Sequence, residues 1–244
     1  MDKSLFTKHI SQKFNQELEN VRQRVLTMGG MVEEQIGDSL EALASLDSNL
    51  CKKVIERDEK VNAYEVSIDE ECARILAKRQ PAAGDLRLVV AIIKTITDLE
   101  RIGDEAEKIA HMANHIALSL EDSMPSKKQF GAVMHLGSHV KTMLNEALDA
   151  FARLDVEAAL KVAQKETTAD KEYNAITRQL ITYMMEDPRS ITSALDVMWS
   201  ARALERIGDH ARNICEYVIY LVEGKDVRHV SLEEMEKLAQ GRQE

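Results

Sequence analysis

The six-residue sequence Leu-Glu-Arg-Ile-Gly-Asp occurs twice in this chain, at Leu99–Asp104 and at Leu204–Asp209. The two copies start 105 positions apart in a chain of 244 residues, and both lie within long helical patterns. A six-residue repeat of this kind indicates an internal duplication. We therefore expect two units of the same fold.

The residues upstream of the two copies also align, at a shift of 108 positions. The aligned pairs include Gly29 and Gly137, Leu40 and Leu148, and Asp47 and Asp155. Pro81 and Pro188 mark the same junction in the two halves, and small length changes near the prolines account for the drift from 108 to 105. The duplication therefore covers most of the chain.

Each half is predicted to form three long helices. Apolar residues recur at steps of three and four, as in Val25, Met28, Val32 and Ile36, a spacing typical of one buried helix face. In the first half, helices are expected from about Lys8 to Leu46, from the cap Asp47 to just before Pro81, and from the cap Asp85 onward. In the second half they are expected over Phe130–Leu154, from the cap Asp155 to about Glu186, and from the cap Ser190 to about Glu223.

This pattern predicts an all-α fold of two pseudo-symmetric three-helix bundles, with six long helices in total. The bundles are expected at residues 1–122 and 127–224, joined by a linker at 123–126. The tail, 225–244, either forms a short helix around 231–238 or frays. A coiled-coil fibre is the rival architecture, but prolines and caps interrupt the heptad pattern too regularly for it.

Composition limits the cellular compartments and the classes of partner that are expected for this chain. Only 4% of the residues are aromatic, which favours helices over strands. The formal net charge of −10 argues against direct binding to nucleic acid, because such binding requires a basic face. The three cysteines form no Cys-x-x-Cys motif, and the longest apolar run, 88–93, is far shorter than the roughly 20 residues of a membrane span. We therefore expect a cytoplasmic protein.

Acidic residues recur at helical spacing beside the apolar stripes. Glu100 and Asp104 lie four apart, as do Glu205 and Asp209, so each pair shares a helix face. Asp58 with Asn62 and Glu166 with Asp170 form a second aligned set, and Asn213 follows Asp209. Because carboxylate and amide oxygens suit hard cations, the candidate metal ligands are Asp58, Asn62, Glu100, Asp104, Glu166, Asp170, Glu205, Asp209 and Asn213.

Two glycines inside the repeated sequence, Gly103 and Gly208, support this interpretation. A glycine inside a helix costs about 0.5–1 kcal/mol relative to alanine, so a matched pair suggests close approach of a helix or a ligand. Lys108 occupies the position of Asn213, and an ammonium group beside a cation predicts a first site that is weaker, smaller or differently composed. In the competing interpretation the acids are solvated and form surface ion pairs, such as Arg101 with Glu105.

Other motifs point away from catalysis. Neither a Glu-x-x-His pair nor a glycine-rich phosphate loop, a serine nucleophile elbow or a catalytic cysteine motif occurs in the sequence. His135 and His139 lie four apart, a spacing that could bind a metal, but the first half has no such pair, and exposed histidines are the preferred interpretation. We therefore expect a protein that is not an enzyme. A metal-dependent hydrolase or oxidase in a helical bundle remains the alternative.

Several short sequences together resemble the PhoU family of phosphate-signalling regulators. Besides the repeated six residues, they are Thr-Met-Gly-Gly-Met-Val-Glu at 27–33, Ala-Lys-Arg-Gln-Pro at 77–81 and Tyr-Met-Met-Glu-Asp at 183–187. The resemblance spans essentially the whole chain. It implies two three-helix bundles with multinuclear metal sites on Glu/Asp-x-x-x-Asp motifs, which here are Glu100 with Asp104 and Glu205 with Asp209.

The resemblance also implies a function and partners. A family member would be a negative regulator of the phosphate-starvation response and of phosphate uptake. It would act as an adaptor at the inner face of the membrane, between the ATP-binding subunit of the high-affinity phosphate ABC transporter and a sensor histidine kinase. The metal would be iron, manganese, magnesium or zinc. Exposed seams on a long bundle also make a homodimer plausible.

Overall fold

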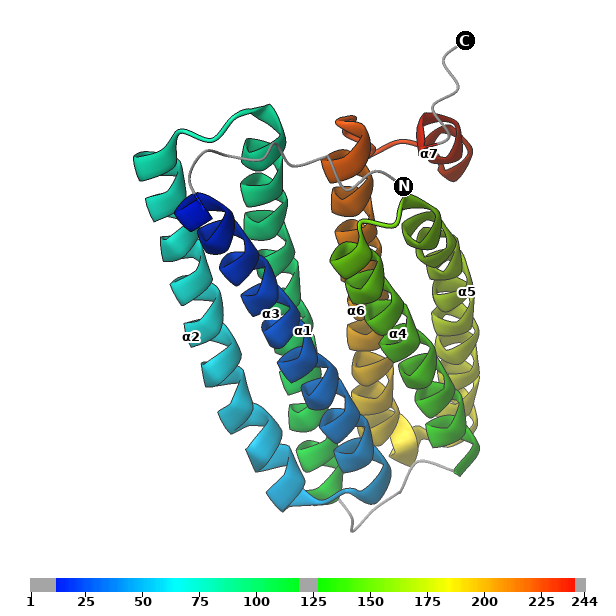
Figure 1. Cartoon of the computed structure of the whole chain (residues 1–244). Coiled ribbons are helices and arrows are strands. Elements are labelled where there is room, and N and C mark those ends of the chain that lie inside the picture. The colour runs from blue at the N-terminus through cyan, green and yellow to red at the C-terminus, as the bar shows by residue number, and fades with distance from the viewer. Residues whose placement is uncertain (1–11, 119–126, 240–244) are drawn as a thin grey trace.

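The computed structural model describes residues 12–118 and 127–239, and nearly all of these residues are helical (Figure 1). The first bundle consists of α1 (Gln12–Ser45), α2 (Ser48–Arg79) and α3 (Ala83–Leu118). The second consists of α4 (Lys127–Arg153), α5 (Val156–Glu186) and α6 (Ile191–Glu223), with the 3₁₀ turn η2 (Pro188–Ser190) before α6 and a short α7 (Leu232–Ala239) after it. The predicted all-α fold of two three-helix bundles is confirmed.

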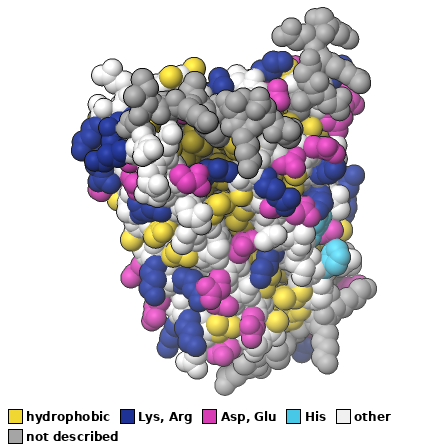
Figure 2. All heavy atoms as spheres, in the orientation of Figure 1, with side chains coloured by type: hydrophobic (Ala, Val, Ile, Leu, Met, Phe, Trp, Pro, Cys, Tyr) yellow, Lys and Arg dark blue, Asp and Glu magenta, His cyan; other side chains and the backbone are white. Residues whose placement is uncertain are grey.

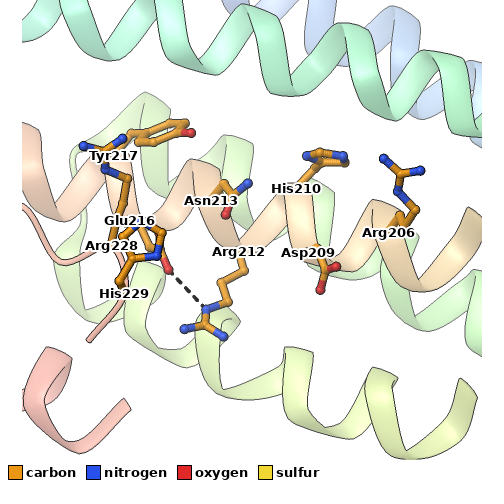
Figure 3. Close-up of a pocket in the computed structure, with 9 residues that line it drawn as sticks. All are labelled: Arg206, Asp209, His210, Arg212, Asn213, Glu216, Tyr217, Arg228 and His229. Atoms are coloured by element: carbon orange, nitrogen blue, oxygen red, sulfur yellow. Dashed lines mark ion pairs between the residues drawn. The ribbon is translucent and has the colours of Figure 1, made fainter. Parts of the chain in front are cut away.

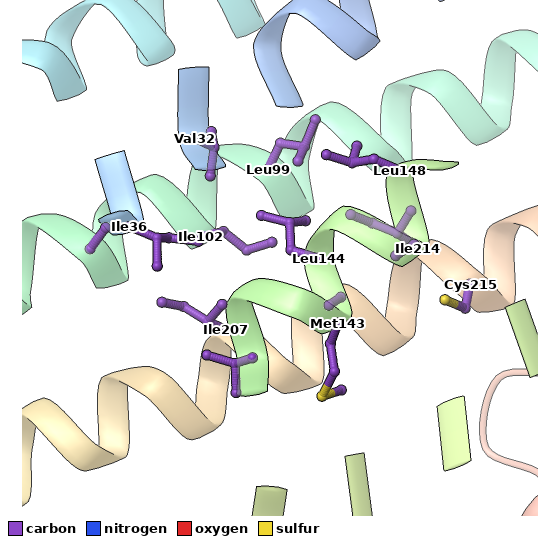
Figure 4. Close-up of a cluster of buried hydrophobic side chains, with 14 of the residues drawn as sticks. Val32, Ile36, Leu99, Ile102, Met143, Leu144, Leu148, Ile207, Ile214 and Cys215 are labelled. Atoms are coloured by element: carbon purple, nitrogen blue, oxygen red, sulfur yellow. The ribbon is translucent and has the colours of Figure 1, made fainter. Parts of the chain in front are cut away.

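The two bundles lie side by side and share one hydrophobic core. α3 and α6 run antiparallel at the centre of the molecule, and α1 faces α4 in front of them (Figure 1). Figure 4 shows apolar side chains from all four helices meeting between the bundles. Examples are Ile36 of α1, Leu99 of α3, Leu144 of α4 and Ile207 of α6. The apolar stripes predicted from the sequence therefore seal the two halves into one body.

The first turn of each bundle is built in the same way. Leu46 and Leu154 take the left-handed conformation, with φ of 54° and 55°. Each is followed by an aspartate whose carboxylate caps the next helix: Asp47 accepts from the backbone N–H of Asn49 and Leu50, and Asp155 accepts from that of Ala158. The two predicted aspartate caps are confirmed, and they fix a tight turn in each copy.

Of the two other predicted caps, Asp85 is wrong, whereas Ser190 occupies the N-cap position of α6 but makes no capping hydrogen bond with its side chain. α3 begins at Ala83, and Asp85 lies buried in its first turn, because the first helical hydrogen bond already closes on the carbonyl oxygen of Ala82. Ser190 does precede α6, but its hydroxyl donates to the carbonyl oxygen of Asp187 and caps no N–H group. The 3₁₀ turn before α6 takes over the capping there, through the carboxylate of Asp187.

Reciprocal glycine–leucine contacts join α1 and α4. A Cβ atom built on Gly29 would lie 2.7 Å from both δ carbons of Leu148, and one built on Gly137 would overlap the δ carbons of Leu40. These are the residues that the sequence alignment pairs with each other. Each repeat thus inserts its leucine over the glycine of the other, as expected for an interface with pseudo-twofold symmetry.

The tail forms the predicted short helix. Ser231 Oγ accepts from the N–H of Glu234, and Met235 of α7 is fully buried, so this segment packs on the body and does not fray. The predicted start of the first helix near Lys8 and the linker at 123–126 lie outside the described residues. Among the helices that are described, none is long and apolar enough to span a membrane.

Candidate metal centre

The first acid group lies at the seam between α2 and α3. It consists of Asp58 and Asn62 from α2 and Glu100, Asp104 and Glu107 from α3. One oxygen each from Asp58, Asp104 and Glu107 lies within 4.8 Å of the other two. Within residues 12–118 and 127–239, this is the one set of three such side chains gathered closely enough to hold a metal ion. The structure thus brings together four of the predicted ligands and adds Glu107.

Gln35 of α1 forms the floor of this group and is fully buried. Its amide nitrogen donates to Asp58 Oδ1 at 3.0 Å and to the carbonyl oxygen of Gly103 at 3.3 Å. Asn62 donates to Asp58 Oδ2 at 2.9 Å. The amide oxygens of Gln35 and Asn62 are both buried and accept no hydrogen bond from the described residues. Buried acceptors without donors are costly, and an oxygen-preferring cation would satisfy them.

Gly103 gives these polar atoms room. A Cβ atom at this position would lie 3.0 Å from Asp58 Oδ1 and 3.3 Å from the amide oxygen of Gln35. At the matching Gly208, the nearest atoms to a Cβ atom would belong to Val140, Ala169 and Met143, at 3.4 Å or more. The predicted close approach is therefore confirmed at Gly103, whereas at Gly208 the contacts would be ordinary van der Waals distances.

Burial and mutual repulsion perturb the acids of the first group. The pKa of Glu100 is raised, first by burial and then by the charges of Asp104, Glu65 and Asp58. The pKa of Asp104 is also raised, again mainly by burial and then by Asp58. Burial likewise raises the pKa of Glu65, one helical turn along α2 from the group. Arg101 near Glu100, and Lys108 and Arg206 near Asp104, offset these effects only in part, so the pKa values stay raised, and a bound metal ion would relieve the remainder.

The second acid group consists of Glu166 and Asp170 from α5 and Glu205 and Asp209 from α6. Burial raises the pKa of Glu166, Glu205 and Asp209 here too. Arginines, however, already pair with two of the acids. Arg212 lies 3.2 Å from Glu166 Oε2, and Arg202 lies 2.7 Å from Glu205 Oε1. The four predicted residues do come together, but with their charge partly neutralised.

The first acid group has fewer paired cations than the second. This difference in charge does not support the expectation, drawn from Lys108, that the first site is the weaker one. Lys108, the basis of that expectation, bonds to Glu105 Oε1 at 3.0 Å, although its charge still lowers the pKa of Asp104. At the position of Glu107 the second repeat has Arg212, and at the position of Gln35 it has Met143. The first group is thus acidic over a polar floor, and the second is salt-bridged over an apolar floor.

Asn213 turns toward the other bundle. Its amide nitrogen donates to Asp98 Oδ1 of α3 at 3.1 Å. His210 Nδ1 lies 2.6 Å from the same oxygen, and the hydroxyl of Tyr217 donates to Asp98 Oδ2 at 2.6 Å. Figure 3 shows Asn213, His210 and Tyr217 pointing to one side of α6, whereas Asp209 points to the other. Asn213 therefore helps to hold α6 against α3.

Sequence reasoning missed Glu107, a member of the first group, and Gln35, which lies beneath it. Glu107 lies three residues after Asp104 on the same face of α3, and this spacing was a usable signal. Gln35 interrupts the buried apolar stripe of α1 between Val32 and Ile36, and a polar residue inside such a stripe usually has a buried partner. The identity of that partner depends on how α1 packs against α2. The periodicity of the sequence does not reveal this packing.

A separate surface feature lies on α6. Ile191, Leu195 and Trp199 follow one another at four-residue spacing and remain exposed, with Trp199 at 61%. Trp199 borders a pocket of about 750 Å³ that also contains Met112 of α3. The other charged and polar residues lining this pocket are Glu105, Lys108, His115, Asp196, Arg202 and Arg206. On the face seen in Figure 2, by contrast, acidic, basic and apolar side chains are interleaved.

Comparison with known proteins identifies close relatives. The sequence profile of the PhoU domain matches twice, at residues 25–113 and 133–218. A phosphate-specific transport system accessory protein PhoU homolog from Pseudomonas aeruginosa is 54% identical, over 97% of this chain and 96% of its own. The phosphate-specific transport system accessory protein PhoU of Escherichia coli K12 is 50% identical, over 99% of this chain and 98% of its own.

Solved structures agree with these sequence matches. The crystal structure of PhoU from Pseudomonas aeruginosa superimposes with a TM-score of 0.83 at 54% identity, covering 87% of this chain and all of that one. The phosphate transport system regulatory protein PhoU from Streptococcus pneumoniae gives a TM-score of 0.79 at 33% identity, covering 88% of this chain and 99% of that one. The twofold domain match coincides with the two bundles.

Proposed function

This chain belongs to the PhoU family, and we propose that it is a negative regulator of the phosphate-starvation response and of phosphate uptake. It would act as a cytoplasmic adaptor between the ATP-binding subunit of the phosphate ABC transporter and a phosphate-sensing histidine kinase. It would reach the membrane through these partners and work as a homodimer. Near-full-length identity to phosphate-specific transport accessory proteins supports this proposal.

The observation that carries the mechanism is the first acid group. Asp58, Asp104 and Glu107 converge over Gln35, whose buried amide oxygen accepts no hydrogen bond in the described part of the chain. A cation bound there would tie α2 to α3 and α1 and would fix the shape of the first bundle. An all-oxygen set favours magnesium, manganese or iron over zinc, which prefers nitrogen and sulfur ligands. The second acid group would bind more weakly, because Arg202 and Arg212 compete for its carboxylates.

The surface around Trp199 is the contact we propose for a partner. Its apolar stripe would receive the apolar face of a helix, since exposed apolar patches of this kind mark interaction sites. Lys108 and Arg206 share one buried carboxylate, that of Glu105, at 3.0 and 3.1 Å, which leaves a net positive charge beside the stripe. The partner helix should therefore carry acidic residues along its flank. Trp199, the single tryptophan, would report docking by its fluorescence.

An enzymatic role is the weaker candidate. A metal-dependent hydrolase or oxidase would use the same acids, but the names of the relatives denote accessory proteins. In addition, the members of the first acid group are carboxylates and the amide of Asn62, and His111 lies 3.5 Å from Glu107 Oε1 as an ion-pair partner outside the group. We propose that the metal has a structural and regulatory role.

The test uses cells that lack this gene and carry a reporter under a phosphate-starvation promoter. Wild-type protein should restore repression when phosphate is plentiful. The variant Asp58→Asn with Asp104→Asn should fail to do so, while the matched variant Glu205→Gln with Asp209→Asn should retain most of the repression. Unchanged reporter output on gene deletion would refute the regulatory role. Full complementation by the first variant would refute the metal's part in it.

A further inference from the structure

One buried carboxylate of the first bundle is held by a cation from each bundle. The side chain of Glu105 on α3 is only 4% exposed, and its Oε1 atom lies 3.0 Å from Lys108 Nζ on the same helix and 3.1 Å from Arg206 Nη1 on α6. Glu105 directly follows Asp104, a member of the first acid group. The second bundle thus places a guanidinium group beside the acid group of the first.

The charge of Arg206 acts on the acid group, and its side chain has room to move. Burial and the charge of Asp58 raise the pKa of Asp104, and the charges of Lys108 and Arg206 lower it in part. The side chain of Arg206 is 46% exposed, so the guanidinium group can turn away from Glu105. Arg206 also lines the pocket of about 750 Å³ around Trp199, and Figure 3 shows it extending from α6 toward α3. One side chain therefore borders both the acid group and the proposed docking surface.

The two repeats differ in the residue that receives this arginine. The repeated six residues contain it in both copies, as Arg101 and Arg206. At a shift of 105, however, the counterpart of Glu105 is His210, whose Nδ1 lies 2.6 Å from Asp98 Oδ1. A histidine offers Arg101 no carboxylate to pair with. We therefore expect the link between the bundles to act on the first acid group and not on the second.

We propose that Arg206 is a displaceable counter-charge through which the first acid group and the surface around Trp199 influence each other. This role rests on the cation site proposed above. Without a cation, Arg206 stays on Glu105 and offsets part of the negative charge. A bound cation repels the guanidinium group, which then turns toward the pocket and pairs with the acidic flank of a partner helix. Because coupling between two binding events is reciprocal, an acidic partner that draws Arg206 away also tightens cation binding.

The experiment is a calorimetric titration of the full-length chain with Mn²⁺. The parent protein carries Glu205→Gln with Asp209→Asn, so that the first acid group alone is titrated. Adding Arg206→Gln should tighten Mn²⁺ binding by about fivefold, the effect of one unit charge at contact distance in water. Arg202→Gln is the matched control, because Arg202 lines the same pocket and is equally exposed, at 47%, but pairs with Glu205. It should change the affinity by less than about twofold, since its charge lies farther from the first group.

Two further measurements do not depend on the affinity. In a chelating buffer at pH 7, Arg206→Gln should unfold at a lower temperature than the parent, because Glu105 and Asp104 lose a counter-charge, and Mn²⁺ should narrow this gap. Trp199 is the single tryptophan, so its fluorescence reports on the pocket. Mn²⁺ should change that fluorescence in the parent, where Arg206 moves, and leave it unchanged in Arg206→Gln.

The outcomes separate this role of Arg206 from the cation site itself. Mn²⁺ binding that Arg206→Gln leaves unchanged would overturn the role and leave the cation site standing. Equal tightening by Arg206→Gln and Arg202→Gln would also overturn it, because the effect would then follow the net charge of the chain. Failure of the parent to bind Mn²⁺ would refute the cation site, and the role of Arg206 with it.

Discussion

At the scale of single residues, Gly103 shows why the repeated sequence matters. It is the position where α3 comes close enough to Asp58 and Gln35 for a methyl group to disturb them. Its counterpart Gly208 lacks that constraint, although the other five residues of the repeated sequence are identical. The same sequence therefore serves a polar site in one repeat and plain packing in the other.

Replacing each glycine by alanine separates the two roles. Gly103→Ala should displace Asp58 by a few tenths of an ångström and weaken metal binding by about tenfold or more, since ligands must be held to within about 0.5 Å. Gly208→Ala should leave binding unchanged and stabilise the fold by about 0.5–1 kcal/mol, the usual helix preference for alanine. Calorimetric titration and thermal unfolding of both variants provide the check. Equal loss of binding in both would contradict the asymmetry.

The perturbed acids also predict a pH dependence. Because the folded-state pKa values of Glu100 and Asp104 are raised, the folded chain holds these protons more tightly than the unfolded chain. Their contribution to stability is therefore present at low pH and is lost as the pH rises through the raised values. In a chelating buffer, Glu100→Gln with Asp104→Asn should unfold at a higher temperature than wild type at pH 7, and the gap should narrow as the pH falls toward 4.

Adding metal at pH 7 should make the wild-type chain unfold at a higher temperature than the variant Glu100→Gln with Asp104→Asn. The wild-type chain should then gain stability by ligand binding, whereas the variant should not respond. Melting curves of both proteins, with and without metal, at several pH values give the comparison. A variant less stable than wild type in the chelating buffer at pH 7 would show that these carboxylates are compensated by something other than a metal.

Individual site residues were predictable from the sequence to different degrees. Glu100, Asp104, Glu205 and Asp209 stood out because they are duplicated at helical spacing. Spacing could not show that arginines cover the second set, because Arg202 and Arg212 have ordinary positions on α6. Those pairings depend on rotamers and on the distance between α5 and α6.

At the scale of elements, the α1–α4 contact sets how closely the two bundles approach. Each glycine of this contact receives a leucine from the other repeat, with no room for a Cβ atom. The glycine–leucine contact is made twice, once in each direction, which is a geometric consequence of duplication followed by pseudo-symmetric packing. The pairing of Gly29 with Gly137 was visible in the alignment, but their contact with the leucines required the fold.

Gly137→Ala should therefore destabilise the protein. Overpacking against Leu40 should cost about 1–3 kcal/mol, more than the gain in helix propensity. Gly131, also in α4, has open space around its Cα, so Gly131→Ala is the matched control and should stabilise by about 0.5–1 kcal/mol. Denaturant unfolding of the two variants measures the difference. A stabilised Gly137→Ala would mean that α1 and α4 lie farther apart than described here.

Helix ends were predicted well where a side chain sets them. Asp47 and Asp155 cap their helices because a tight turn leaves no other acceptor for the first N–H groups. Asp85 is no cap, and the side chain of Ser190 caps no N–H group, because helical backbone begins two residues earlier in each case, at Ala83 and at Pro188. Proline favours helical backbone at the start of a helix or turn. The prolines therefore set where these segments begin, and the residues with capping side chains do not.

At the scale of the whole molecule, duplication gave two similar scaffolds that have since diverged in chemistry. The first repeat keeps an acid group over Gln35 whose burial is offset only in part by nearby cations. The second has covered its acids with arginines. One shared core joins the repeats, so a cation that stiffens α2 and α3 also changes the surface that α3 and α6 present to a partner. Metal occupancy could in this way control docking.

The most direct test of this account is the metal content of the purified chain after exposure to magnesium, manganese and iron, measured by elemental analysis. The wild-type chain and the variant Glu205→Gln with Asp209→Asn should both retain ions. The variant Asp58→Asn with Asp104→Asn should lose them. Equal metal content in all three proteins, or loss only in the second-repeat variant, would contradict the central claim that the first acid group is the cation site.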